Sequence, residues 1–234
     1  MRKSMQLKYQ LKLQRVALLI RNLLSFKKAY PEFIESVTDE EMIWRDGTKM
    51  PIDDKIPNKT QQETLDNPSL LDVIRGPAYV AGTPSDKVSF QPTEDPGRIR
   101  YLPLFKKMYG QSEAEVKSKV VTIYWMPKFF ADKYPLEVST VNGVNQKLLL
   151  VSAQLEQLVA IHPEYLGYLE DPGGTFCWRV IANTNRLSAH CFGMTVDINS
   201  MQSDYWQWDL KKEGHKINQE TNENQPLNYR NHVP

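Results

Sequence analysis

The strongest constraint on the fold is a change of periodicity at the turn pair Asn142-Gly143. Before this turn, residues 120–125 and 136–141 are rich in β-branched and apolar side chains, which predicts two strands. After it, residues 146–161 place Leu148, Val151, Leu155 and Leu158 at helical spacing, which predicts a helix. Strands and helices without a repeating βαβ rhythm favour an α+β fold with a small antiparallel sheet.

The chain divides into three regions. Residues 1–28 are basic and partly apolar, and an amphipathic helix, a degenerate export signal and a membrane-surface helix all fit them. Residues 29–112 are rich in turn-forming residues, which predicts an irregular accessory region with a short helix at 69–75. Residues 113–234 contain the regular strand and helix patterns and form the expected main domain.

Charge and cysteine content narrow the functional classes. The chain has 29 Lys+Arg against 28 Asp+Glu, and this balance argues against a general nucleic-acid binder. No run reaches the ~18 to 20 apolar residues that a transmembrane span requires. Two cysteines, Cys177 and Cys191, are too few for a disulfide scaffold. We therefore expect a soluble enzyme or binding domain, with its oligomeric state left open.

The residues with the clearest chemical potential are His190 and Asp197. Residues 176–181 and 194–199 are both predicted as strands, and alternation in the second places Asp197 on its polar face. His190 lies seven positions earlier, so an unbroken strand would point the two side chains to opposite faces. Gly193 lies between them and allows a bulge or tight turn that resets the register. A converging imidazole and carboxylate suit zinc, although a plain hydrogen bond also fits the spacing.

A resemblance to a known family favours zinc binding over a plain hydrogen bond between His190 and Asp197. The pattern Ser188-x-His190-x-x-Gly193-x-x-x-Asp197 resembles the signature of VanY-like zinc peptidases. These are the D-alanyl-D-alanine carboxypeptidases and L-alanyl-D-glutamate endopeptidases of bacterial cell-wall peptides. The resemblance to one secreted bacterial branch extends from about residue 29 to the end, in residues 95–101, 108–110, 141–144, 178–199 and 205–208.

The resemblance implies a fold and a site. The fold would be of the Hedgehog/D,D-peptidase type, a small antiparallel sheet flanked by helices, here with an irregular N-terminal extension. His190 and Asp197 would be two of three protein ligands of Zn²⁺, and Ser188 would bind substrate. Arg179, with Arg186 as second choice, would steady the developing oxyanion; a salt bridge or a solvated loop is the plainer role for both. The implied partner is a peptidoglycan stem peptide in the bacterial periplasm or cell envelope, and the lack of a clean signal peptide keeps the cytoplasm open.

The sequence also departs from the family pattern. Thr195, Asn183, Cys177 and Cys191 occupy positions where the family or its branch usually has Ala, Gly, Asn and Ser, respectively. The two cysteines fit either a disulfide or free thiols.

The family's third zinc ligand, a His, and its general base, a Glu, follow a further helix. His162, His215 and His232 do not have the setting expected of that ligand. The sequence thus predicts an incomplete zinc site in a domain that lacks its C-terminal segment. The two resulting alternatives are an impaired zinc peptidase and a non-catalytic remnant or cell-wall-peptide-binding domain of the same fold.

Overall fold

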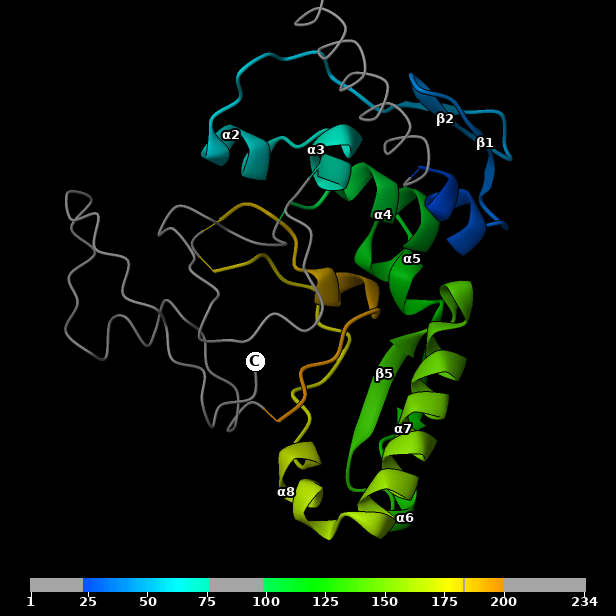
Figure 1. Cartoon of the computed structure of the whole chain (residues 1–234), viewed down its shortest axis with the longest axis vertical. Helices are drawn as coiled ribbons and strands as arrows, with labels where there is room; N and C mark the ends of the chain where they lie inside the picture. The colour runs from blue at the N-terminus through cyan, green and yellow to red at the C-terminus, as the bar shows by residue number, and fades with distance from the viewer. Residues whose placement is uncertain (1–22, 76–98, 183, 200–234) are drawn as a thin grey trace, which may run out of the picture. The chain divides into compact units, whose positions relative to one another are not determined.

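The computed structural model describes residues 23–75, 99–182 and 184–199 of the 234-residue chain (Figure 1). These residues belong to two compact units, which meet along the chain between Met108 and Tyr109. Each unit has its own small antiparallel sheet and helices, which confirms the α+β class. Among the described residues, no helix combines the length and apolar character needed to span a bilayer. Most of the basic segment, residues 1–22, lies outside the described residues.

The first unit contains a three-stranded meander of β1 (Ile34–Val37), β2 (Glu41–Trp44) and β3 (Lys49–Pro51). Gly47, with φ of 79°, makes the turn between β2 and β3. Each strand buries side chains on one face, among them Met42, which is fully buried. This sheet was not among the predicted elements, because strands of three or four residues are too short to show a clear alternation.

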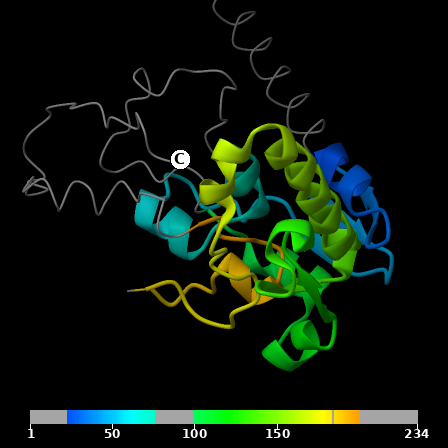
Figure 2. The same ribbon diagram turned by 90° about the horizontal axis from the view of Figure 1, so that it is seen from below.

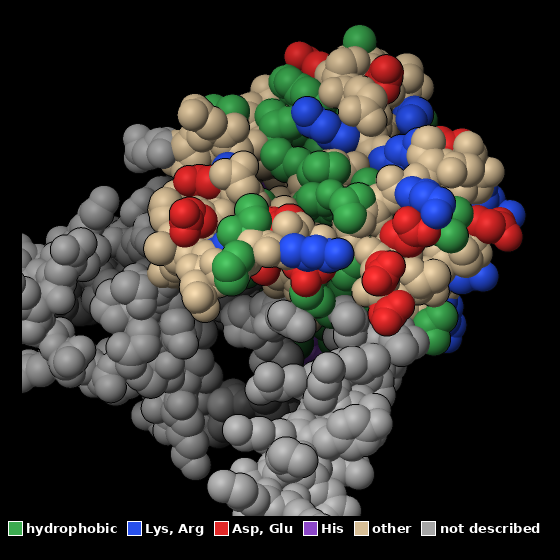
Figure 3. Space-filling view, turned by 90° about the horizontal axis from the view of Figure 1, so that it is seen from above, with side chains coloured by type: hydrophobic (Ala, Val, Ile, Leu, Met, Phe, Trp, Pro, Cys, Tyr) green, Lys and Arg blue, Asp and Glu red, His purple; other side chains and the backbone are tan. Residues whose placement is uncertain are grey.

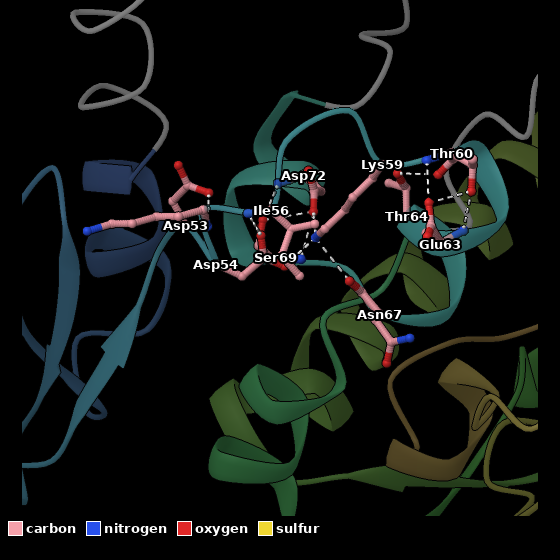
Figure 4. A network of polar contacts seen from close by, with 11 residues as sticks. Asp53, Asp54, Ile56, Lys59, Thr60, Glu63, Thr64, Asn67, Ser69 and Asp72 are labelled. Atoms are coloured by element: carbon pink, nitrogen blue, oxygen red, sulfur yellow. Dashed lines mark hydrogen bonds and ion pairs between the residues drawn. The ribbon is translucent and has the colours of Figure 1, made fainter.

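The helices of the first unit are α2 (Gln61–Asp66), α3 (Leu70–Arg75) and most of α4 (Leu102–Tyr109). The predicted helix at 69–75 is therefore confirmed. Lys59 connects the loop before α2 to α3, since its ammonium group donates hydrogen bonds to the carboxylates of Asp54 and Asp72 (Figure 4).

The second unit contains β4 (Val120–Tyr124) paired antiparallel with β5 (Pro135–Ser139). Its helices and helical turns are α5 (Glu113–Lys117), α6 (Pro127–Phe130), η2 (Val141–Gly143), α7 (Val144–Ile161), η3 (Pro163–Tyr165), α8 (Leu166–Leu169) and η4 (Ala189–Phe192). The two predicted strands and the long predicted helix are confirmed. Their core includes Trp125, Val138 and Val159, all buried.

Helix α7 does not turn all its regularly spaced apolar side chains to the core. Val151 and Leu158 are exposed, whereas Ser152 and Glu156 are buried. Both buried polar side chains accept hydrogen bonds from the start of α6: Ser152 Oγ from the Met126 amide at 2.7 Å and Glu156 Oε1 from the Lys128 amide at 2.7 Å. Because these amides need acceptors at a helix N-terminus, they draw the polar face of α7 inward.

The strands predicted at 176–181 and 194–199 are wrong. Both segments are coil in Figures 1 and 2, with one isolated bridge between Val180 and Leu187. The residues after Gly193 also fail to alternate, since Ile198 is 39% exposed. Gly193 and Asn199, at the two ends of the second segment, both have left-handed backbone.

On the face shown in Figure 3, Lys and Arg side chains lie interspersed with Asp and Glu side chains. Hydrophobic side chains lie among them on the same face. Such a mixture does not build a strong field of one sign over that face.

Candidate metal centre

A single helical turn presents His190. This is η4, a 3-10 turn whose first amides need a cap, and Ser188 Oγ accepts a hydrogen bond from the His190 amide at 3.3 Å. Gly193 ends the turn with φ of 60°, and its carbonyl accepts a hydrogen bond from the Ser139 amide of β5 at 2.9 Å. The turn is therefore held to the end of β5, and this fixes the backbone from which the imidazole projects.

Asp197 lies on the extended segment that follows Gly193. Its carbonyl accepts a hydrogen bond from the Gly173 amide at 2.8 Å, and its amide donates to the Gly174 carbonyl at 3.5 Å. The side chain is 58% exposed. Backbone contacts thus hold Asp197 while its carboxylate stays accessible.

The side chains of His190 and Asp197 converge, as predicted from a break in the chain at Gly193. His190 Nε2 lies 3.4 Å from Asp197 Oδ1, and the imidazole is only 14% exposed. His190 Nδ1 lies 2.9 Å from the backbone carbonyl of Thr175. A carbonyl only accepts, so Nδ1 carries the proton. In the neutral imidazole, Nε2 then directs a lone pair at a carboxylate, and this arrangement is favourable only with a proton or a cation between them.

The geometry of this pair fits zinc. Zn–N and Zn–O bonds of about 2.0 to 2.2 Å at a tetrahedral angle place two ligand atoms about 3.3 to 3.5 Å apart. The observed 3.4 Å falls in this range and is longer than the 2.7 to 2.9 Å typical of a charge-assisted hydrogen bond. An Nδ1–H held by a backbone carbonyl is also the usual outer-shell partner of a zinc-binding histidine.

The described residues offer two metal-binding side chains at this place. Among them, no group of three or more His, Cys, Asp or Glu side chains is arranged to hold a metal ion. His162 follows α7, and its Nδ1 lies 3.1 Å from Glu164 Oε1. His215 and His232 lie outside the described residues.

Ser188 and Arg179 lie on neighbouring segments. The Ser188 amide donates to the Arg179 carbonyl at 3.0 Å, while the Arg179 side chain is exposed. Ser188 itself is buried, and its hydroxyl caps the turn that carries His190. Arg186 is half-buried, and its amide donates to Thr184 Oγ1 at 3.1 Å.

Both cysteines are free thiols, so the disulfide alternative is not the one observed. Cys177 is exposed and Cys191 is buried. Cys191 Sγ accepts from the Arg179 amide and donates to the Arg179 carbonyl, at 3.2 and 3.1 Å. Burial raises the pKa of the Cys191 thiol. The Cys191 side chain therefore hydrogen-bonds to the backbone of Arg179 in this structure.

Sequence reasoning missed Gly173 and Thr175, which hold the pair through backbone groups. Backbone amides and carbonyls are common to all residues, so the sequence carries no residue-type signal for these contacts. Comparison of the chain with protein-family models, curated proteins and solved structures found no match.

Proposed function

We propose that this chain is a zinc-dependent peptidase acting on bacterial peptidoglycan peptides, of the D,D-carboxypeptidase or L-Ala-D-Glu endopeptidase type. Its activity is expected to be impaired, because the sequence offers neither the family's third zinc ligand nor its general base in the expected setting. One observation carries the proposal: His190 Nε2 and Asp197 Oδ1 face each other at 3.4 Å while the Thr175 carbonyl holds Nδ1. The resemblance of residues 188–197 to VanY-like peptidases supplies the substrate class. The same resemblance is the basis for proposing the bacterial periplasm or cell envelope as the site of action, with the cytoplasm as the alternative because the sequence has no clean signal peptide.

In this proposal, His190 and Asp197 hold the metal. Zinc bound there would lower the pKa of a water molecule and polarise the carbonyl of the peptide bond. Thr175 keeps the imidazole in the tautomer that leaves Nε2 available, and Asp197 supplies a negative charge that offsets part of the metal charge. Two protein ligands alone bind zinc weakly, and this is why an impaired enzyme is proposed.

The remaining roles are proposed for three residues that the resemblance implies. The exposed guanidinium of Arg179, with Arg186 as second choice, is the proposed cation that steadies the substrate carbonyl as it gains negative charge. Ser188 is the proposed substrate-binding residue, in addition to its observed cap on the turn of His190.

The proposal is tested by incubating the full chain with Zn²⁺ and with peptidoglycan stem peptides, followed by mass spectrometry of the products. Loss of a terminal D-Ala identifies the carboxypeptidase type, and cleavage after L-Ala identifies the endopeptidase type. His190→Ala should abolish either cleavage, whereas His162→Ala should not, because His162 lies at the end of α7 and is not a proposed zinc ligand. Binding of intact peptides without cleavage would contradict the enzyme and identify the wall-peptide-binding domain instead.

A further inference from the structure

One tripeptide holds both members of the His190–Asp197 pair. The Thr175 carbonyl accepts from His190 Nδ1, while the Gly173 amide and the Gly174 carbonyl bond to the backbone of Asp197. Thr175 is itself fixed, because its buried hydroxyl donates a hydrogen bond to the Glu137 carbonyl of β5. We call residues 173–175 the backbone clamp.

Within the backbone clamp, Gly173 has no room for a side chain. A Cβ at this position would lie 2.9 Å from Asp197 Cβ and 3.5 Å from Asp197 Oδ2. Carbon atoms in contact stand about 3.5 to 4.0 Å apart, so any side chain here displaces Asp197. Its backbone is not in the left-handed region, so space alone requires the glycine. Gly174 differs, since its φ is 86° and a Cβ there would meet nothing within 4 Å.

We propose that Gly173 is a positioning residue of the metal centre: the absence of a side chain lets Asp197 approach the clamp and stand opposite His190. This inference rests on the proposed zinc function for its consequence, but the displacement of Asp197 is expected with or without metal. A methyl group at position 173 pushes Asp197 outward and breaks the hydrogen bond between the residue 173 amide and the Asp197 carbonyl.

The first measurement needs no zinc. Hydrogen exchange of the residue 173 amide is compared in the metal-free full chain between the wild type and Gly173→Ala, with Gly167→Ala as control. Gly167 lies in α8, and a Cβ there meets nothing within 4 Å. We expect Gly173→Ala to lose protection at this amide by at least about tenfold, while Gly167→Ala leaves it unchanged. Unchanged protection in Gly173→Ala would overturn the inference.

A double variant separates positioning from misfolding. Asp197→Gly removes the Cβ that a methyl group at position 173 would strike. Protection of the residue 173 amide should therefore return in the Gly173→Ala, Asp197→Gly chain relative to Gly173→Ala alone. If the single variant fails to fold, recovery of a cooperative unfolding transition in the double variant is the equivalent result. No recovery would show that the methyl group acts elsewhere and would overturn the inference.

Measurement of zinc affinity then tests whether the backbone clamp supports metal binding. Gly173→Ala should weaken Zn²⁺ binding about 10- to 100-fold, the range for loss of an outer-shell partner of a metal ligand. Gly167→Ala should bind as the wild type does. If wild-type chain binds no zinc while the exchange results hold, the proposed function fails and the positioning of Asp197 by Gly173 stands. Equal zinc affinity in Gly173→Ala and wild type would refute the role of Gly173 in the metal centre.

Discussion

The imidazole of His190 is hydrogen-bonded through Nδ1 to the backbone carbonyl of Thr175, at 2.9 Å. This bond decides which nitrogen faces Asp197. Because the carbonyl has no proton to give, Nε2 is left with its lone pair opposite Oδ1 in the neutral ring. The chemistry of the centre thus depends on how firmly the Thr175 carbonyl is held.

Thr175→Val should loosen this anchor with little change in volume. The variant removes the hydroxyl that donates to the Glu137 carbonyl, and a lost hydrogen bond of this kind costs about 1 kcal/mol of unfolding free energy. The ¹⁵N shifts of the His190 ring in the metal-free chain should move towards a mixture of tautomers. Thr140→Val is the matched control, since Thr140 Oγ1 donates to the Lys119 carbonyl at 2.9 Å. If both variants leave the His190 shifts equal to those of wild type, Thr175 does not anchor the ring.

Gly193→Ala should destabilise the second unit by more than its backbone strain alone. A residue other than glycine at φ of 60° costs about 1 to 2 kcal/mol, and a Cβ here would also lie 3.0 Å from the Ser139 amide nitrogen. Gly174→Ala has a similar left-handed backbone but no atom within 4 Å of its Cβ, so it reports the strain alone. Urea unfolding of both variants measures the difference. Equal losses would show that close packing against β5 contributes nothing.

The Lys59 network should contribute more stability than an exposed ion pair. The Lys59 side chain is 7% exposed and donates to Asp54, Asp72 and the Asn67 carbonyl. Lys59→Met should cost about 1.5 to 3 kcal/mol, since it leaves partly buried acceptors without their charged donor. Lys49→Met is the control, because its pair with Glu41 is exposed and should contribute about 0 to 1 kcal/mol. Chemical unfolding that gives equal losses for the two variants would contradict this ranking.

The same network predicts a pH dependence. Burial alone would raise the pKa of Asp72, but hydrogen bonds from Lys59 and Ser69 outweigh burial and hold this pKa below the ordinary value for an aspartic acid. A carboxyl group whose folded-state pKa is lowered stabilises the fold above its unfolded pKa and loses that contribution as pH falls through the folded pKa. Stability should therefore fall from about pH 4 downward, and Asp72→Asn should flatten this part of the profile. An unchanged profile in the variant would contradict the assignment.

The elements that sequence reasoning predicted correctly are those with local signals. The β-branched run of β4 and the apolar spacing of α7 are properties of contiguous residues, and the turn at Asn142-Gly143 separates β5 from α7. The meander in the first unit escaped prediction because its strands are held by pairing between segments and not by a long pattern. Residues 194–199 have a strand-like sequence, yet only two backbone bonds join them to Gly173 and Gly174. Among the described residues, no continuous partner strand pairs with this segment, so local preference alone did not make a strand there.

The candidate metal centre was also predictable only in part. Convergence of His190 and Asp197 was predictable, because Gly193 offered a break between an imidazole and an acid seven positions apart. The supporting contacts were not predictable, since Thr175 acts through its backbone carbonyl and Gly173 through the space left by a missing side chain. Neither property depends on a recognisable side-chain pattern.

The central claim, a zinc centre at His190 and Asp197, is tested most directly by zinc affinity measured with a competing chromophoric chelator. The full chain should bind one Zn²⁺ weakly, because His190 and Asp197 are two of the three ligands that the resemblance implies. His190→Ala should weaken this binding by at least about 100-fold, beyond the range for an outer-shell partner. The control His162→Ala should bind as the wild type does. Zinc affinity in His190→Ala equal to that of the wild type would contradict the account.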